Sequence, residues 1–574
     1  MTTAPTPLDE LMSCGLPKYG VRELVVTQSF IPSSALQCRQ NPAAPRHLRY
    51  TTARLRGIDC IPTDTEFAND RNMNQKQRQG EAIDPSSRRS RVAIIGTGLA
   101  GLTTAYLVHH DGRKRYGVTL FEQADTLSLD AASITLSNAK TGKNERVDVP
   151  PRSFCKGYYN NLVRMYEHLG IGLQRIRLIW VYTKASTTSQ HEPPPEPRNA
   201  ETIPGTYFVY NRRLHELLLL SPNFWHSSLR QILQTFYLAI CHIWFFMACF
   251  LLQPWTSQSE HYSDVDSDTK PSSDSETFHH YLQRIRLPRQ YAVYYLLPVL
   301  SIICSCSHAE MMDFPASDVV DFVKGSFFRK TFVPQGGVNR VQSTLSRGIE
   351  NVRLGARVTQ VIRVDQGMLV RWEQTEDGRS SSLEEIFDRV VLAVSPNVAA
   401  TIFSPSRSTL GVIPTAPVTS SILAPLSGDV SLVRGEGQTP SGECSYRGGD
   451  AQIMEFRTTF HGGTARSESF HFLPSGVVIR TSPSACIAES KGSLHTSKFT
   501  RTLRTTRSRS MVQRVMGKDT SAHGSEDVWV NGKDNVWIVG SWCWDGLVLL
   551  EGCVVSAMKV AEDFGVSIPW SEKQ

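Results

Sequence analysis

The stretch Arg91-Val-Ala-Ile-Ile-Gly-Thr-Gly-Leu-Ala-Gly101 decides the fold. A short apolar run ends in three glycines spaced as Gly-x-Gly-x-x-Gly, and residues 102–110 can continue as a helix. This spacing lets the chain turn tightly, bring its backbone up to a pyrophosphate and pack the helix against the strand. Because the helix N-terminus would face the anion, the stretch predicts a dinucleotide site.

A second apolar run, residues 117–121, follows this helix and ends at Glu122. A carboxylate about 20 residues beyond such glycines can accept the ribose hydroxyls of an adenine dinucleotide, and it would repel a 2′-phosphate. The pattern therefore favours FAD or NAD over NADP, against the alternative of a plain strand–helix turn. The residues predicted to bind the adenine dinucleotide are Gly96, Gly98, Leu99, Ala100, Gly101, Glu122 and Gln123.

A second unit of strand, glycine turn and helix lies near the end of the chain. Residues 535–542 form an apolar run that passes through Gly540, and a helix is expected from about Leu550 to Phe564. A simple nicotinamide site does not need such a second unit. The C-terminal unit therefore favours FAD over NAD.

Several separated segments together resemble the flavin-containing amine oxidoreductase superfamily, in particular its NAD/FAD-binding oxidoreductase branch in microbes and fungi. The resemblance covers roughly residues 91–566. The segments that carry it are Val92–Leu102 with Leu120–Glu122, Asp148–Pro150 with Tyr158–Leu162 and His168–Gly170, Tyr295–Pro298 with Cys304–Cys306, Pro334–Gly337, Arg357–Val358, Val391–Val394 and Gly540–Ala557. It implies an α/β fold, FAD-binding and Rossmann-like of the two-dinucleotide-binding-domain type, with a mixed α+β substrate domain.

The resemblance also implies roles for residues outside the glycine turn. It places Val358 against the adenine and closes residues 393–396 over the nucleotide. Gly540 and Ser541 would approach the ribityl chain and the pyrophosphate. These residues extend the predicted FAD site to the second half of the chain.

The predicted C-terminal helix completes the site that the resemblance implies. Its start, at Leu550, Glu551 and Gly552, would face the pyrimidine end of the flavin. Reduced flavin carries negative charge near N1, which a helix N-terminus stabilises. The alternative is that residues 549–557 form only an amphipathic terminal helix.

The sequence departs from the family just after Glu122. The family often has a paired-glycine and basic motif there, which supports the pyrophosphate, whereas this chain has Leu127-Ser-Leu-Asp-Ala-Ala-Ser133. The small residues permit a close approach, but the basic partner is missing. Arg152 is a candidate to supply charge nearby.

No catalytic side chain is assigned, because in this superfamily the flavin does the hydride chemistry. Four aromatic residues are candidates to line the pocket, although ordinary packing is the stronger interpretation for each. They are Tyr158, Tyr159, Trp542 and Trp544. His308 could transfer a proton, but a core histidine is favoured. Cys543 or Cys553 could bear covalent flavin, but burial as a small apolar residue is favoured.

Composition excludes several other classes. The chain has 574 residues, an apolar fraction of 40% and a net charge of +7 from 61 basic and 54 acidic residues, with no long basic run. This is typical of a globular enzyme and not of a nucleic-acid partner.

The twelve cysteines lack the paired spacing of a zinc site, so no metal is expected. The N-terminus lacks the pattern of a cleaved signal peptide, and we expect a cytoplasmic protein.

Residues 232–252 form a continuous apolar run that is long enough to span a bilayer. A single crossing would place the two parts of one FAD domain on opposite sides of the membrane, where they could not share a sheet. The run is therefore expected to be either a buried helix near the substrate or an interfacial helix in peripheral contact with a membrane. The two interpretations are about equally favoured.

These features predict a sequence of six regions. They are an extension at 1–88 without stable structure, a first FAD-binding part at 89–183, a helical substrate part at 184–330 with the apolar helix and low-complexity loops, a second FAD-binding part at 331–400, a β-rich substrate part at 401–530 and a C-terminal FAD-binding part at 531–574.

The predicted function is that of an FAD-dependent oxidoreductase of the amine oxidase type. It would remove a hydride from a C–N or C–C bond of a small organic substrate, and the apolar run slightly favours an apolar one. Two alternatives stay open. One is a flavin-dependent isomerase or desaturase of a lipid-like substrate, and the other is a membrane-peripheral binding protein with a vestigial flavin site. The sequence does not indicate an oligomeric state.

Overall fold

The computed structural model describes residues 89–138, 143–185, 205–210, 229–255, 275–376, 379–424, 430–432, 451–461, 464–483, 493–518 and 529–571. The predicted extension at 1–88 lies outside the described residues, as does most of the two predicted low-complexity loops. All described residues belong to one compact unit, so the boundaries of the six predicted regions stay predictions.

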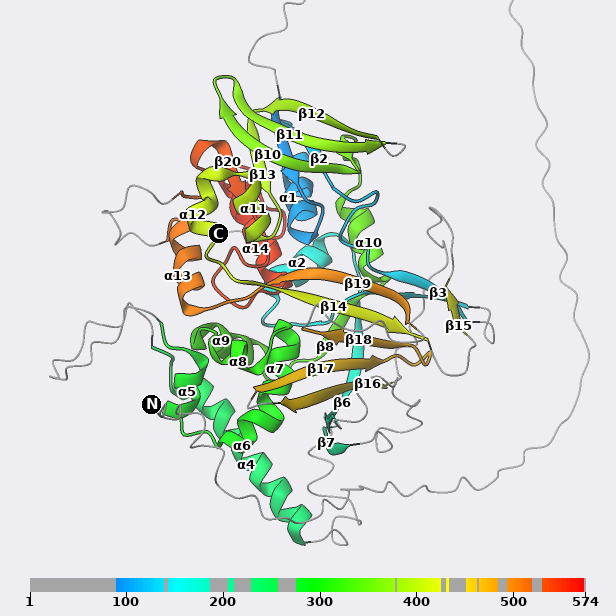
Figure 1. Cartoon of the computed structure of the whole chain (residues 1–574), viewed down its shortest axis with the longest axis vertical. Helices are drawn as coiled ribbons and strands as arrows, with labels where there is room; N and C mark the ends of the chain where they lie inside the picture. The colour runs from blue at the N-terminus through cyan, green and yellow to red at the C-terminus, as the bar shows by residue number, and fades with distance from the viewer. Residues whose placement is uncertain are drawn as a thin grey trace, which may run out of the picture. The chain divides into compact units, whose positions relative to one another are not determined.

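A five-stranded parallel sheet forms the centre of the fold, in the order β20-β13-β1-β2-β9. Its strands are β1 (Ser90–Ile95), β2 (Tyr116–Phe121), β9 (Val352–Arg353), β13 (Arg389–Leu392) and β20 (Val536–Ile538). Apolar β-branched runs suit these strands because both faces of a parallel sheet are covered. Segments that are far apart in the sequence therefore lie side by side, as Figure 1 shows for β13 and β20.

Alternate residues of β1 face two separate apolar cores, as the two-residue period of a strand requires. Val92 and Ile94 belong to a core with helices α1 (Leu99–His109), α2 (Asn160–His168), α10 (Gly337–Leu345) and α14 (Leu550–Asp563). Ala93 and Ile95 belong to a core on the other face of the sheet. All four are at most 5% exposed. The glycine turn at the end of β1 thus begins from a rigid central strand.

Three antiparallel strands and several short helices supply the second core. They are β10 (Ala356–Val364), β11 (Gly367–Glu376), β12 (Arg379–Phe387), α11 (Pro396–Ile402), α12 (Arg407–Leu410) and α13 (Thr506–Val515). The 3-10 helices η5 (Ser404–Ser406) and η6 (Lys533–Asn535) contribute no side chain to this core. The rings of Trp372 and Phe387 meet Phe121 of β2 edge-on, at 5.2 and 5.8 Å between centroids. The parallel sheet is therefore covered on both faces.

A second sheet is mixed and has nine strands, which come from both halves of the chain. Its strands are β5 (Phe154–Cys155), β6 (Leu173–Lys184), β7 (Thr206–Tyr210), β8 (Thr331–Pro334), β14 (Thr415–Leu423), β16 (Ala451–His461), β17 (Thr464–Phe472), β18 (Val478–Ser482) and β19 (Ser493–Thr502). A small sheet joins β3 (Ile134–Asn138), β4 (Lys143–Val147) and β15 (Val430–Leu432). Parallel and mixed sheets together confirm the predicted α/β class with an additional mixed part.

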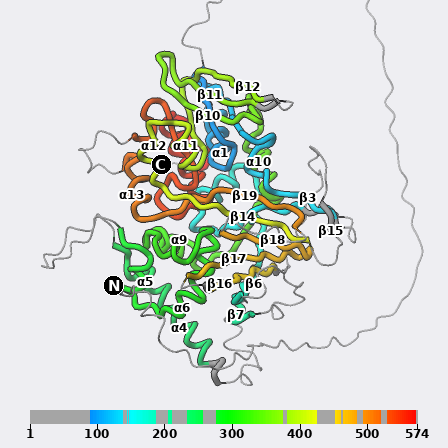
Figure 2. The backbone as a smooth tube through the Cα atoms, viewed as in Figure 1, coloured from blue at the N-terminus to red at the C-terminus, as the bar shows by residue number. Residues whose placement is uncertain are grey.

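A helical layer follows β7 in the chain. Its elements are α4 (Leu229–Leu251), α5 (Phe278–Arg284), α6 (Arg289–Tyr291), the π-helix η4 (Ala292–Leu296), α7 (Leu297–Cys304), α8 (His308–Met312) and α9 (Ala316–Ser326). Figure 2 shows the chain path through these helices.

Helix α4 is the predicted apolar run. Its window Leu233–Leu251 has a mean hydropathy of 1.6 and is long and apolar enough to cross a membrane by these two criteria alone. Strand β6 precedes α4 and β16 follows it, yet the two strands pair over eight residues of one sheet. A crossing would separate these strands, so α4 does not span. Only 28% of the window is buried, which also excludes a helix enclosed on all sides.

Candidate dinucleotide site

The glycine turn after β1 has the geometry that the sequence predicts. Gly96 has a φ of 103°, and a Cβ added there would lie 2.5 Å from the carbonyl oxygen of Ala393. A Cβ on Gly101 would lie 2.0 Å from the carbonyl oxygen of Gly96. Gly98 differs, because nothing lies within 4 Å of its Cβ position and no side chain caps α1 from it. The first N–H groups of α1 therefore adjoin open space that suits an anion.

Glu122 lies beside this turn at the end of β2 and is buried. Its carboxylate accepts from the backbone N–H of Thr97 at 3.1 Å and the hydroxyl of Thr97 at 2.6 Å, and from the N–H of Ala124 at 3.1 Å. A carboxylate has about four acceptor sites, so one stays available for a ribose hydroxyl. Gln123 is exposed. The sequence did not predict a role for Thr97, because its hydroxyl donates to Glu122, which is distant in the sequence.

Strand β10 brings Val358 to the same end of β2. The N–H of Ala356 donates to the carbonyl of Glu122 at 2.8 Å, and the N–H of Gly355 donates to that of Ala124 at 2.8 Å. The pairing of β10 with β11 shifts between Val358 and Gln360, which is a bulge in the strand. Val358 is half-buried two residues beyond the contact with Glu122.

The C-terminal segment turns after β20 in the manner expected for Gly540. Its N–H donates to the hydroxyl of Ser556 at 3.0 Å. A Cβ on Gly552 would lie 2.4 Å from both the carbonyl oxygen of Ser541 and the indole nitrogen of Trp544. Glycine is therefore required at 552 for the start of α14 to pack on residues 541–544.

The first turns of α1 and α14 meet, which brings the two predicted halves of the site together. Ala100 in the first turn of α1 lies near Cys553 in the first turn of α14, and burial raises the pKa of the Cys553 thiol to about 11. Arg152 and Arg501 lie close enough to oppose that rise. Glycine turn, terminal helix and two guanidinium groups thus share one region of the interior.

Glu551 is directed to another helix. Its carboxylate accepts from the N–H and the side-chain amide of Asn161 at 2.9 and 2.8 Å, and from the N–H of Leu162 at 3.0 Å. It therefore caps the start of α2, and burial raises its pKa in spite of these three donors. Leu550 is half-buried and Gly552 buried at the start of α14.

Two arginines, Arg152 and Arg501, lie near Cys553 where α1 and α14 pack together. The Nε atoms of both are buried and have no hydrogen-bond partner among the described residues. Burial lowers the pKa of Arg152, and Arg501 lowers it further, whereas Asp148 and Cys553 raise it. Two like charges in the interior favour a bound anion between them. Arg501 was not predicted, because no sequence pattern marks it.

The segment that replaces the family's basic motif carries a carboxylate instead. Asp130 forms an ion pair with Arg146 of β4 and accepts from the side-chain amide of Asn339 at 3.0 Å. Nearby, Asp148 accepts from the N–H of Val338 at 3.1 Å, and burial together with Asp130 raises its pKa to about 6. This region binds α10 and leaves Arg152 as the cation that faces α14.

Tyr158 contacts the C-terminal segment, to which the candidates Trp542 and Trp544 belong. The hydroxyl of Tyr158 accepts from the N–H of Leu547 at 3.0 Å, and its ring meets Trp544 at 5.8 Å. Tyr159 is buried in the helical core. Trp542 is buried in the other core, where its indole donates to Val394 at 3.4 Å.

His308 is a core residue. It is buried at the start of α8, its Nε2 bonds the hydroxyl of Ser467 at 2.8 Å, and burial lowers its pKa to about 4. Cys543 is fully buried with a raised pKa, so it is no nucleophile. Within the residues that the structure describes, no group of three His, Cys, Asp or Glu side chains could hold a metal.

Arg504 organises the C-terminal segment and was missed by the sequence analysis. It is 1% exposed, and one terminal nitrogen donates to the carbonyls of Trp542, Trp544 and Gly546 at 3.1, 2.8 and 3.0 Å. Asp318 lies 3.6 Å from its Nε. No local signal could reveal this role, because the acceptors are backbone carbonyls about 40 residues later in the chain.

Comparison with known proteins identifies the first part of the chain. Residues 94–169 match the family model of the NAD(P)-binding Rossmann-like domain. This match confirms the predicted Rossmann-like fold and the dinucleotide-binding part of the resemblance. No curated protein matches the sequence.

Two solved structures are similar to the chain. One is the CLA-producing fatty acid isomerase from P. acnes, with a TM-score of 0.46 and 11% identity over 83% of this chain and 99% of that one. The other is cyclohexylamine oxidase from Brevibacterium oxydans IH-35A, with a TM-score of 0.46 and 12% identity over 83% of this chain and 100% of that one.

Proposed function

We propose that the protein is an FAD-dependent oxidoreductase. The observation that carries the proposal is the packing of α1 on α14, with Ala100 at the start of α1 near Cys553 at the start of α14. Glu122 lies at the ribose end of this region, and Arg152 supplies a cation inside it. A nicotinamide site would need only the first of the two helices, so the second favours FAD.

The residues present fit FAD. The open Cβ position of Gly98 and the uncapped start of α1 leave room and N–H donors for the pyrophosphate. The buried Nε of Arg152 is a donor that has no partner among the described residues, as expected beside a charged ligand. Val358 lies at the adenine end, and residues 540–541 and 550–552 lie toward the flavin end.

A bound flavin would supply the two-electron chemistry, and the side chains of this chain would bind, orient and shield it. Arg504 and Tyr158 hold residues 542–547 in place through backbone carbonyls and an N–H. The start of α14 would face the flavin ring, where the positive end of the helix dipole would stabilise negative charge. The reaction we propose is removal of a hydride from a C–N or C–C bond of a small organic substrate.

A cluster of aromatic side chains between η4, β6 and β7 favours an apolar substrate. Tyr295 of η4 lies 6.1 Å from Tyr182 of β6, 5.8 Å from Tyr207 and 5.3 Å from Phe208 of β7, between ring centroids. Burial raises the pKa of Tyr182, so this cluster stays uncharged. Helix η4 is a π-helix, a geometry found often at functional sites. Conversion of a lipid-like substrate without net reduction of an acceptor would indicate an isomerase at the same site.

The first test is the visible absorption spectrum of the purified protein, compared with that of the variant Gly98→Asp. Gly98 has extended backbone angles at the N-cap of α1, so aspartate suits the fold there while its charge opposes a pyrophosphate. We expect flavin bands in the wild type and a folded, colourless variant. The variant Gly98→Asn is the neutral control, and it should retain more flavin than Gly98→Asp.

A colourless wild type that takes up no added FAD would contradict the proposal. Equal flavin content in Gly98→Asp and Gly98→Asn would contradict the placement of the pyrophosphate at this helix. Far-ultraviolet circular dichroism of each variant shows whether the fold is retained.

A further inference from the structure

Helix α4 has one buried face and one apolar face that is exposed. Its buried face packs on α9 and consists of Leu238, Cys241, Phe245, Ala248 and Cys249. The exposed face consists of Leu233, Phe236, Tyr237, Ile240, Ile243, Trp244, Met247, Phe250 and Leu251. Ile240, Ile243 and Leu251 are 65%, 62% and 68% exposed, respectively. An apolar face of this length is unusual in water and marks an interaction site.

No charged side chain interrupts this face, since residues 231–255 contain no Asp, Glu, Lys or Arg. Within residues 231–255, His242 is the one side chain whose usual pKa, about 6.5, lies near pH 7, so it is mostly neutral at that pH. Its Nδ1 bonds the hydroxyl of Tyr291 at 2.7 Å. Charge therefore does not oppose insertion of α4 into an apolar medium.

Phe328 extends the face beyond α4. It is 79% exposed, and its φ of 49° lies in the left-handed region that bulky residues rarely adopt. Its ring lies 4.3 Å from that of Phe327, which in turn lies 4.7 Å from Phe246 and 5.6 Å from Phe250 of α4. An unfavourable backbone angle that displays an apolar ring is an independent sign of an external contact.

Aromatic and basic groups surround the face. Trp244 donates to the carbonyl of Ile285 at 2.8 Å, and Trp255 stacks on the guanidinium of Arg284 at 4.6 Å. Four exposed cations lie close in sequence to Ile285 and Phe328. They are Arg286, Arg289, Arg329 and Lys330. The carboxylate of Asp321 in α9 interacts with Lys324 and Arg509. Tryptophan and cations beside an apolar surface are typical of a bilayer interface.

We infer that α4 and Phe328 dock on the surface of a lipid bilayer that contains anionic lipids. The helix lies flat in the interface, because its other face packs on α9 and the paired strands β6 and β16 prevent a crossing. A second copy fits this face less well. In a symmetric dimer the cations around the face would meet their own copies, whereas an anionic membrane attracts them.

The experiment is co-sedimentation of the full-length protein with phosphatidylcholine vesicles, prepared with and without about 30% phosphatidylserine. The double variant Ile240→Glu/Ile243→Glu places two carboxylates on the exposed face. We expect it to lower the vesicle-bound fraction by about tenfold. Leu383→Glu is the matched control, since Leu383 is exposed on β12, away from this face in the chain. It should bind like the wild type.

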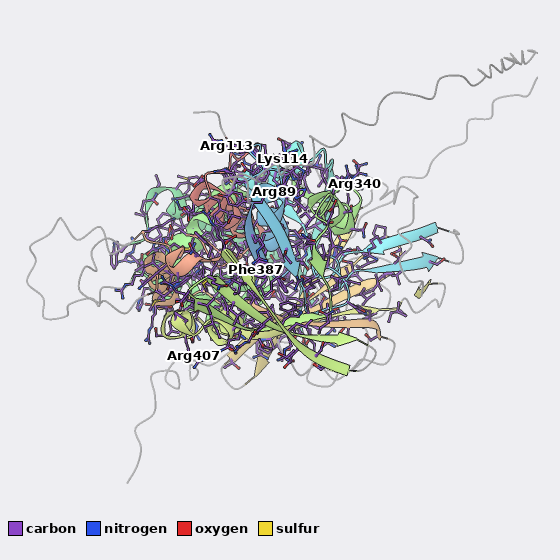
Figure 3. All side chains as sticks on the ribbon, turned by 90° about the horizontal axis from the view of Figure 1, so that it is seen from above. Arg89, Arg113, Lys114, Arg340, Phe387 and Arg407 are labelled. Carbon is purple, nitrogen blue, oxygen red and sulfur yellow. The ribbon has the colours of Figure 1, made fainter. Side chains whose placement is uncertain are left out.

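The basic groups have their own variants. Arg329→Glu/Lys330→Glu should weaken binding to the phosphatidylserine vesicles by about tenfold. The charge-matched control is Arg113→Glu/Lys114→Glu, at the exposed turn before β2 that Figure 3 labels, and it should change binding little. Melting temperatures of all variants near that of the wild type establish that they fold.

Three results would overturn the inference. One is a wild type that stays in the supernatant with either vesicle, and another is a double glutamate variant that sediments like the wild type. The third is a wild-type dimer that becomes monomeric in Ile240→Glu/Ile243→Glu, which would assign the face to a second copy. Size-exclusion chromatography with light scattering measures that state. Vesicle binding does not depend on FAD, so this test can fail or succeed independently of the proposed function.

Discussion

At the scale of single residues, Arg152 is the most informative position. The sequence shows that the family's basic motif is missing, and the structure places the guanidinium of Arg152 near Cys553 and Arg501 with a buried Nε that no described residue satisfies. A charged donor in the interior is retained only if a ligand or a partner compensates it. We therefore propose that Arg152 supplies the charge that the missing motif would provide.

The variant Arg152→Met should weaken FAD binding by about 10- to 100-fold, because a hydrogen bond to a charged group contributes about 1.5–3 kcal/mol. Fluorescence titration of the apoprotein with FAD measures this change. Riboflavin lacks the pyrophosphate, so its affinity should change little. Arg340→Met, at an exposed position labelled in Figure 3, is the control. Equal losses for FAD and riboflavin would assign Arg152 to folding instead.

Some residues of the site are predictable and others are not. Glu122 follows from its distance to the glycines, because the length of a strand–helix–strand unit is nearly constant. Thr97, Arg501 and Arg504 act on carboxylates or backbone carbonyls that are distant in the sequence. Their side chains leave no periodic signal. Sequence reasoning could therefore recognise the ligand-facing glycines but not the groups that support them.

At the scale of elements, the connection between α14 and α2 decides how the C-terminal helix is placed. Glu551 was predicted to lie at the flavin, and the structure shows that its carboxylate caps α2 through Asn161 and Leu162. A cap satisfies N–H groups that the helix cannot satisfy itself. The backbone of α14 can face a ligand while the side chain of its first turn fixes the helix to its neighbour.

Glu551→Ala should lower the free energy of unfolding of the apoprotein by about 1–3 kcal/mol, since it leaves buried donors without an acceptor. Urea unfolding followed by circular dichroism measures the change. Glu562→Ala, at an exposed position of the same helix, should have little effect. A similar loss in both variants would show that helix propensity, and not the cap, is responsible.

The strand order is predictable in part for a physical reason. A glycine turn between strand and helix marks β1 and β20 locally, and parallel strands joined by helices follow from it. The nine-stranded sheet lacks such a signal. Its pairing of β6 with β16 joins Trp180 to Met454 across almost half of the chain, and only the tertiary fold selects it.

At the scale of the whole molecule, buried histidines make the fold sensitive to acid. Burial lowers the pKa of His308 and His471 to about 4, below the usual value of 6.5. The unfolded chain then binds more protons than the folded one between these values, so stability is lost as pH falls from about 6.5 toward 4. Asp148 opposes this trend, because its raised pKa of about 6 lets the folded state take up a proton first.

We expect each of the two histidines to cost about 2 kcal/mol of stability between pH 7 and pH 5. Urea unfolding at the two pH values measures the loss. His471→Gln should reduce the loss, because glutamine does not titrate. The exposed His279→Gln is the control and should leave the difference unchanged. A pH dependence that is the same in His471→Gln and the wild type would contradict this assignment.

The strand order of the parallel sheet also has a consequence for synthesis. Strand β1, at its centre, leaves the ribosome early, whereas β20 and α14 are made last. Until they emerge, the edge of β13 and the apolar face of α1 have no cover, and such surfaces bind chaperones or aggregate. Premature termination near residue 530 therefore yields a product that lacks β20 and α14, and with them the C-terminal half of the proposed site.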